Sequence, residues 1–174
     1  QAVSDDTNEQ LRDLLQALQA VKIGDFSARL PGDWEGVLGK VADNFNEIVA
    51  ANARMAAELE RVGYTVGRDG RTKQRVKFVN RAGAWGEMEG SVNTLIDDLL
   101  WPTEEMTRAV GAVAQGDLLQ TVRLEVDGRP LKGEFLRSAK IVNTMVRQLR
   151  EFSSEVTRVA REVGAEGKLG GQAQ

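Results

Sequence analysis

The sequence of 174 residues contains no cysteine and no histidine. Without cysteine the segment has no disulfide, no thiolate metal ligand and no thiol nucleophile, and without histidine it has no imidazole ligand, no histidine general base and no phosphohistidine acceptor. Most familiar catalytic and transition-metal sites are therefore excluded. We expect a protein with no enzymatic activity, no cofactor and no metal.

Long apolar runs and an excess of positive charge are also missing. No stretch approaches the roughly 20 apolar residues that span a bilayer, and the net charge of -3 supplies no overall basic field for nucleic acid. The 41% hydrophobic and 28% charged residues are typical of a globular or helical protein. We expect a cytoplasmic segment with no nucleic-acid partner and no direct membrane insertion. Because it starts without methionine and ends inside an unfinished pattern, we interpret it as part of a longer protein.

Two marks recur along the chain and indicate a tandem repeat. One is an asparagine between apolar residues, which recurs 47 and 50 residues apart, at Asn46, Asn93 and Asn143. The other is a glycine, which recurs 46, 46 and 51 residues apart, at Gly24, Gly70, Gly116 and Gly167.

Alignment on the asparagines gives three apolar runs with gaps that alternate strictly between three and four residues. They extend over residues 38–66, 85–113 and 135–163. Such gaps are typical of a coiled-coil seam and predict three helices, each about 43 Å long, that need partners along their whole length. The seam residues that we single out as bundle core and signal relay are Leu38, Phe45, Ile48, Asn52, Trp85, Val92, Leu95, Leu99, Pro102, Met106, Phe135, Val142, Met145, Leu149 and Phe152. The aromatic residues Trp34, Trp85 and Phe135 are expected to begin helices.

Glycine-marked connectors separate the runs, at residues 24–36, 67–83 and 116–133. A connector of this length can return along a helix, so that the next helix points the same way. Spaced apolar residues predict that the connectors are pinned to the helices; these residues are Phe26, Leu30, Val76, Phe78, Leu118, Val122, Leu124 and Val126.

A helix that ends at Gly-Asp-apolar, an extended connector with pinned apolar residues, and a second helix with an asparagine in mid-heptad together resemble the HAMP signalling module. The tandem copies are similar to the poly-HAMP region of sensor and hybrid histidine kinases. The third copy is the clearest: Pro102 lies near the start of its first helix, Gly116-Asp117-Leu118 ends that helix, and Glu134-Phe135-Leu136 opens the second.

The resemblance implies an all-α fold of concatenated parallel four-helix coiled-coil bundles formed by a homodimer. The repeats are residues 8–54, 55–100 (divergent), 101–151, and 152–174 as the truncated start of a further divergent repeat. The resemblance also implies a non-enzymatic relay that passes conformational change from an upstream sensor to a downstream output domain of the same polypeptide, such as a histidine kinase. The implied connector and helix-exit residues are Gly24, Asp25, Leu30, Gly70, Val76, Gly116, Asp117, Leu124 and Glu134.

The repeats differ after the register glycine. Asp25 and Asp117 follow it in the first and third repeats, where we expect them to cap or solvate the helix exit, but Arg71 and Lys168 follow it in the others. Divergent repeats therefore alternate with typical ones. This alternation suggests that one packing geometry is converted into another along the chain.

Several alternatives stay open at this stage. The chain can be a static dimeric spacer or dimerisation scaffold, or a helical domain that binds a ligand or nucleic acid, for which the basic run of residues 68–77 is the candidate patch. Asn52 either fixes register and oligomeric state or faces a water-filled gap where two repeats join. Pro102 is either a relay kink or only a helix-start mark or local bend.

Overall fold

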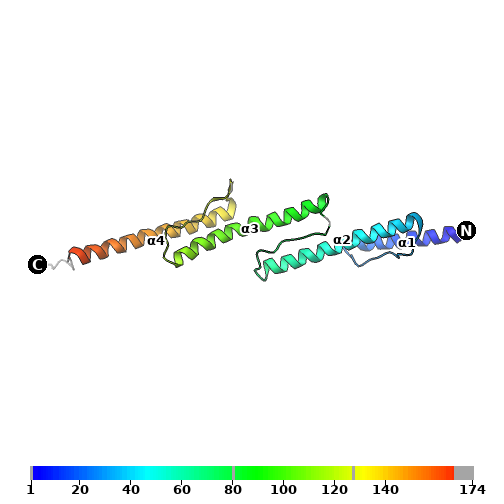
Figure 1. Ribbon diagram of the computed structural model, residues 1–174, viewed down its shortest axis with the longest axis horizontal. Coiled ribbons are helices and arrows are strands. Elements are labelled where there is room, and N and C mark those ends of the chain that lie inside the picture. Colours follow the sequence, from blue (N-terminus) through cyan, green and yellow to red (C-terminus); the bar gives the residue numbers. More distant parts are fainter. Residues whose placement is uncertain (1, 80, 127, 167–174) are drawn as a thin grey trace. The chain divides into compact units, whose positions relative to one another are not determined.

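The computed structural model describes residues 2–79, 81–126 and 128–166. Within these residues the chain forms four helices, namely α1 (Ala2–Lys22), α2 (Gly36–Gly67), α3 (Ala84–Ala114) and α4 (Gly133–Glu166) (Figure 1). Two short strands, β1 (Glu125–Val126) and β2 (Arg129–Pro130), pair antiparallel in the last connector. The described chain is thus essentially all-α, and no helix in it combines the length and the apolar character needed to cross a membrane.

Each of the three apolar runs lies inside one uninterrupted helix, which confirms the predicted helices. The run from residue 38 to 66 lies in α2, and the next two lie in α3 and α4. The predicted connectors coincide with the segments between the helices. Each connector returns beside the helix that it leaves, so that α1 and α2, for example, run in the same direction (Figure 1).

A third glycine mark appears where each connector enters the next helix. Gly36, Gly83 and Gly133 have φ values of 64°, 56° and 54° and lie ten residues before the recurring asparagines. Because this left-handed conformation favours glycine, these positions fix the turn into the helix. The sequence predicts that Trp34 begins a helix, and this prediction is wrong. Trp34 lies in the connector before α2 and packs against the buried apolar cluster of α1, α2 and this connector.

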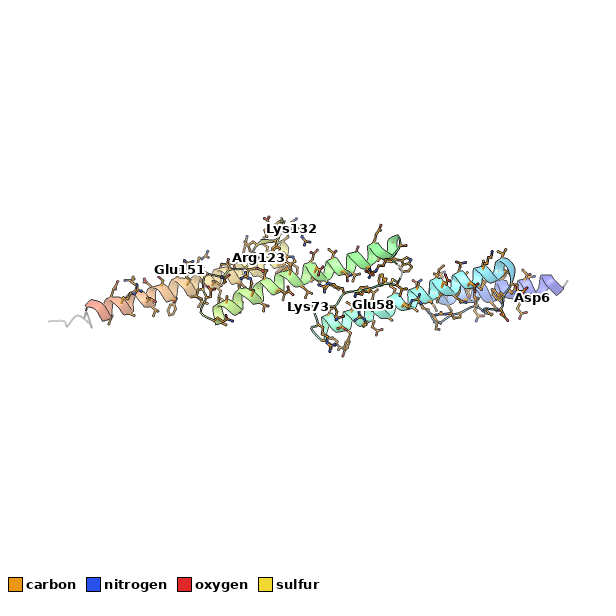
Figure 2. The ribbon with its side chains drawn as sticks, in the orientation of Figure 1. Asp6, Glu58, Lys73, Arg123, Lys132 and Glu151 are labelled. Carbon is orange, nitrogen blue, oxygen red and sulfur yellow. The ribbon has the colours of Figure 1, made fainter. Side chains whose placement is uncertain are left out.

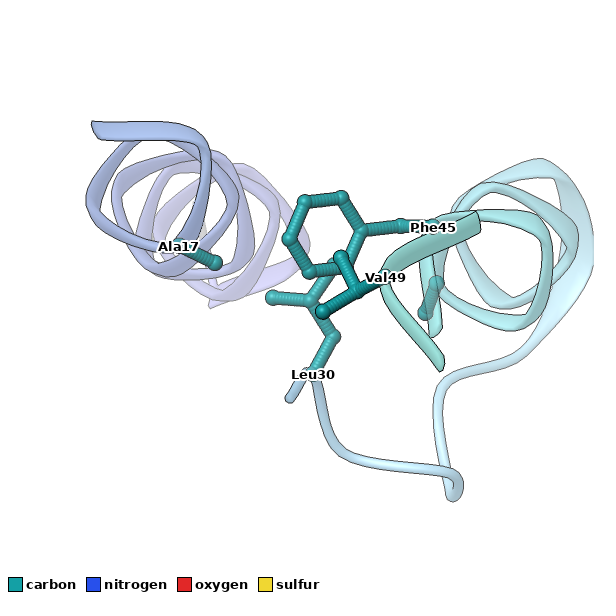
Figure 3. Close-up of a cluster of buried hydrophobic side chains, with 5 residues drawn as sticks. Ala17, Leu30, Phe45 and Val49 are labelled. Atoms are coloured by element: carbon teal, nitrogen blue, oxygen red, sulfur yellow. The ribbon is translucent and has the colours of Figure 1, made fainter. Parts of the chain in front are cut away.

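The described residues fall into two compact units that divide between Ile96 and Asp97. The first unit contains two buried apolar clusters. One is built from α1, α2 and the first connector by Ala17, Leu30, Ala42, Phe45 and Val49 (Figure 3). The other centres on Val62, Val76 and Phe78.

The second unit has one buried cluster, formed by Ala109, Val122, Leu131 and Ala139. In all three clusters a connector residue lies between the helix before it and the helix after it. The same arrangement of helix, connector and helix therefore occurs three times, and we call these the first, second and third repeats. The helices α2 and α3 each belong to two successive repeats.

Candidate functional site: the clamped connectors

The recurring asparagine holds the connector in each repeat. Its side-chain oxygen accepts a hydrogen bond from the backbone N–H of one connector residue, and its amide nitrogen donates to the carbonyl oxygen of the same residue. The pairs are Asn46 with Leu30 (2.9 and 2.9 Å), Asn93 with Val76 (2.8 and 3.0 Å) and Asn143 with Val122 (2.7 and 3.0 Å).

The clamped residues are the most deeply buried part of each connector. Leu30, Val76 and Val122 are 5%, 1% and 2% exposed. A buried backbone N–H and C=O need partners, and the asparagine amide supplies both. The sequence identified this asparagine as a repeat mark, but nothing in the sequence showed that it binds the connector backbone.

The helix exits of the first and third repeats have the same geometry. Gly24 has φ 88°, its N–H donates to the Val21 carbonyl at 2.9 Å, and the Asp25 N–H donates to the Ala20 carbonyl at 3.0 Å. Gly116 has φ 83° and shows the same two bonds, with Val113 and with Ala112 through the Asp117 N–H. This is the Schellman motif, in which glycine tolerates the left-handed conformation that ends the helix.

The aspartates after these glycines fasten the exit turn. Asp25 accepts hydrogen bonds from the Ser27 hydroxyl at 2.6 Å and the Ser27 N–H at 2.9 Å. Asp117 accepts a bond from the Leu119 N–H at 3.0 Å. The Ser27 bonds, that of the hydroxyl above all, hold the pKa of Asp25 below its usual value. Both carboxylates thus fasten the turn after the helix, whereas backbone N–H groups satisfy the last helical carbonyls.

The second repeat leaves its helix differently. Arg68 and Asp69 both donate from their backbone N–H to the Tyr64 carbonyl, and the Arg71 N–H reaches back to the Thr65 carbonyl. Gly70 again has a positive φ, of 67°. From Val62 to the clamped residue the second repeat has one residue more than the corresponding segments of the other two. The sequence divergence at Arg71 thus has a structural counterpart.

A buried carboxylate adds a second fastening to the third repeat. Glu105 on α3 is 7% exposed and binds Arg123 of the connector at 2.6 Å and Arg108 of its own helix at 3.0 Å. Arg108 also donates to the Gln120 side chain and to the Thr121 carbonyl. The hydrogen bonds from Arg123 and then Arg108 lower the pKa of Glu105 to about 2.

The second repeat contains the same fastening with a different connector partner. Glu58 lies on α2 (Figure 2). It binds Arg61 at 2.8 Å and accepts the backbone N–H of Lys77 at 3.0 Å. Arg61 reaches the Gln74 side chain at 3.4 Å, as Arg108 reaches Gln120. The bond from Arg61 is the main cause that lowers the pKa of Glu58.

We call this Glu-x-x-Arg pair, together with the connector atoms that it binds, the latch. The first repeat does not carry it, because Asp13 and Gln16 occupy the two helix positions. Sequence reasoning missed the latch entirely. The signal that could have revealed it is the recurrence of Glu-x-x-Arg before an apolar residue at the same spacing as the asparagines.

The structure divides the predicted seam residues into three groups. Phe45 and Pro102 are buried. Half-buried are Leu38, Asn52, Trp85, Val92, Met106, Phe135 and Val142. Exposed are Ile48, Leu95, Leu99, Met145, Leu149 and Phe152. A single chain thus covers one side of the seam and leaves the other open.

Pro102 does not lie near a helix start, because α3 runs without interruption from Ala84 to Ala114. The interpretation as a start mark is therefore wrong. Proline has no N–H, so the carbonyl of Asp98 loses its helical partner at this point. The buried ring lies beside Trp101 and the connector residue Leu131 in a surface hollow of the third repeat.

Leu124 is not pinned, contrary to expectation. Its side chain is 37% exposed, and Leu131 is buried instead, at 5%. The reason is the β1–β2 hairpin, which returns the longer third connector so that the Leu131 N–H donates to the Leu124 carbonyl at 2.8 Å. Phe78, the counterpart of Leu124 in the second repeat, is buried, at 8%.

Two further predicted positions make only local contacts. Asn52 donates its amide to the Ile48 carbonyl of its own helix at 2.9 Å. Glu134 lies exposed in the first turn of α4, 3.6 Å from Arg137. A carboxylate there is favourable because it faces the positive end of the helix dipole.

The basic run of the second connector behaves as an extended segment. Arg75 folds back on the connector and donates to the carbonyls of Thr72 and Gln74, whereas Lys73 and Lys77 are exposed. Two other expectations, Gly167 as a register mark and Lys168 after it, lie outside the described residues.

Among the described residues, no three or more carboxylates converge as the ligands of a metal ion would. No protein-family model matches the chain, and no solved structure matches it significantly. Its function must therefore be argued from its own residues.

Proposed function

We propose that the chain is a non-enzymatic signal relay of the HAMP type. It acts as a parallel homodimer in the cytoplasm and passes conformational change between a sensor and an output domain of the same polypeptide, such as a histidine kinase. In this proposal each repeat contributes two helices from each chain to a four-helix bundle.

The observation that carries the proposal is an open apolar stripe on α4. Its residues follow one another at gaps of four, three and four residues and are 38% to 70% exposed: Met145, Leu149, Phe152 and Val156. A continuous stripe of this spacing is the seam of a coiled coil, and leaving it in water is unfavourable. A second copy of the chain, with the same stripe at the same level, covers it.

Relay follows from how helices and connectors are joined. Because α2 and α3 are each shared by two repeats, a rotation or tilt of such a helix in one repeat is imposed on the next. The asparagine clamp makes the connector move with the second helix of its repeat. A repeat with two packings of similar free energy then shifts its neighbours between their own two packings.

Single cysteines test the dimer, since the chain has none of its own. We expect Leu149→Cys to form intersubunit disulfides rapidly, because position 149 lies on the stripe. Arg147→Cys, on the other side of the same helix, should form almost none. A monomeric mass in solution together with no crosslink at position 149 would overturn the proposal.

A static spacer predicts the same dimer and must be separated from a relay. For a relay, we expect Ile48→Cys, Leu95→Cys and Met145→Cys, in separate proteins, to crosslink at different rates. We also expect Arg71→Asp in the second repeat to change the crosslinking rate of Met145→Cys in the third. Rates at position 145 that do not respond to Arg71→Asp would favour the spacer.

A further inference from the structure

The helix half of the latch occurs a third time, on a part of α4 that none of the connectors in the described residues covers. Glu-x-x-Arg followed by an apolar residue recurs at Glu58, Glu105 and Glu155, again 47 and 50 residues apart. Glu155 pairs with Arg158 at 2.7 Å, and Val159 follows, as Val62 and Ala109 follow the other two pairs.

The exposure of the three sites differs sharply. The Glu58 and Glu105 side chains are 19% and 9% exposed beneath their connectors, whereas Glu155 is 60% exposed. Val62 is 3% exposed, but its counterpart Val159 is 47% exposed. The third site thus carries the same side chains in the same order without the cover that the first two have.

The guanidinium of Arg158 differs from those of Arg61 and Arg108 in the group that it binds. In the other two sites the Nη1 atom of the arginine donates to a connector glutamine, Gln74 or Gln120. In α4 the same atom donates to Glu162, one turn further along the helix, at 2.6 Å. The position of Glu162 is taken by Thr65 and Ala112 in the other helices, so neither of the two covered sites has a carboxylate there.

The two covering segments define what such a site binds. Both are extended and share a pattern of glutamine, any residue, valine and a basic residue: Gln74-Arg75-Val76-Lys77 and Gln120-Thr121-Val122-Arg123. The valine packs on the apolar residue of the helix, the glutamine meets the arginine, and the residue after the valine meets the glutamate through its backbone N–H or its guanidinium.

We infer that the surface of α4 formed by Glu155, Arg158 and Val159 is a docking site for an extended segment of the Gln-x-Val-basic type. The inference rests on the proposed function for the view that this half of α4 opens a further repeat. It adds the position of the site and the chemistry of its occupant.

A peptide with the sequence of residues 72–79 tests the site on the whole chain. A short linker holds such a segment at an effective concentration in the millimolar range, so the free peptide is added to millimolar concentration. We expect saturable amide shifts in the NMR spectrum confined to residues 154–162. A peptide of the same composition in scrambled order should cause none.

Matched variants of the chain assign the contact. Glu155→Gln removes the charge that meets the basic end of the peptide and should weaken binding at least about threefold. Glu47→Gln makes the same change at an exposed position of α2 and should leave binding unaltered. No shifts at millimolar peptide, shifts elsewhere in the chain, equal shifts with the scrambled peptide, or equal binding by Glu155→Gln would each overturn the inference.

The outcome is separate from that of the proposed function. If the Leu149→Cys disulfide forms and the peptide does not bind, only the docking site is wrong. If the chain is a monomer without that disulfide, the proposed function is wrong whatever the peptide does.

Discussion

The residue that holds the connector in each repeat is a half-buried asparagine. Asn143 satisfies both backbone groups of Val122, which is 2% exposed, and no strand runs beside the connector there to do so. A buried amide without partners loses its hydrogen bonds to water and gains nothing in return. The recurrence of asparagine thus has a physical cause, since its amide can accept from the N–H and donate to the carbonyl of the same connector residue.

Replacing Asn143 by alanine should therefore cost about 2 to 4 kcal/mol of unfolding free energy, because it leaves a buried N–H and a buried C=O unpaired. Urea unfolding at a fixed protein concentration measures this. Asn44→Ala is the matched control, since the Asn44 amide binds only the Lys40 carbonyl of its own exposed helix face. Equal losses for the two variants would show that the clamp contributes nothing.

The carboxylate of Glu105 makes stability depend on pH. Its folded pKa of about 2 lies below the ordinary value of 4.5. The ionised form is therefore favoured in the folded state, and its contribution is complete above pH 4.5 and lost as the pH falls toward 2.

Glu105→Gln should be less stable than the unchanged chain by about 2 kcal/mol at pH 7, a value reduced for solvent around the exposed arginines. The difference should shrink below pH 4.5 and nearly vanish near pH 2. Urea unfolding across this range measures it, with Glu104→Gln, on the exposed neighbour, as the control for charge alone. A difference that stays constant with pH would contradict the assigned ion pairs.

At the scale of elements, glycines set where helices stop. Gly116 ends the helix in the left-handed region at φ 83°, whereas Gly111 lies inside α3 with open space where a Cβ would be. The same substitution should thus have opposite effects at two positions five residues apart.

Gly116→Ala should destabilise the chain by about 1 kcal/mol, because alanine resists a positive φ. Gly111→Ala should stabilise it by roughly 0.5 to 1 kcal/mol, because alanine loses less backbone entropy in a helix interior. Thermal or urea unfolding of the two variants decides the sign. Destabilisation by Gly111→Ala as large as that by Gly116→Ala would contradict the exit geometry.

Helices and connectors were predictable because their signals repeat locally. The three-four gaps gave α2, α3 and α4 nearly to their ends, and the glycines gave the exits. The latch was not predictable in this way, because Glu105 on α3 and Arg123 of the connector lie 18 residues apart in the sequence. The burial of Leu131 in place of Leu124 was not predictable for a similar reason, since it depends on the pairing of β1 with β2.

At the scale of the whole molecule, the proposed function makes the chain one half of a parallel dimer. Within each repeat the connectors cover one side of the seam, while residues such as Ile48 and Leu95, each 58% exposed, remain open. In the proposed dimer, a second chain in the same orientation would place each open residue beside its own copy. The proposed relay between repeats would act through that dimer.

The orientation of the two chains is tested most directly by disulfides at two levels of one helix, Met145→Cys and Val156→Cys in separate proteins. Eleven residues of helix span about 16 Å, and a disulfide needs Cβ atoms about 4 Å apart. We predict that both variants crosslink efficiently, because parallel copies meet at every level. An antiparallel pair can bring at most one of the two positions together, so a crosslink at only one of them, or at neither, would contradict the parallel dimer.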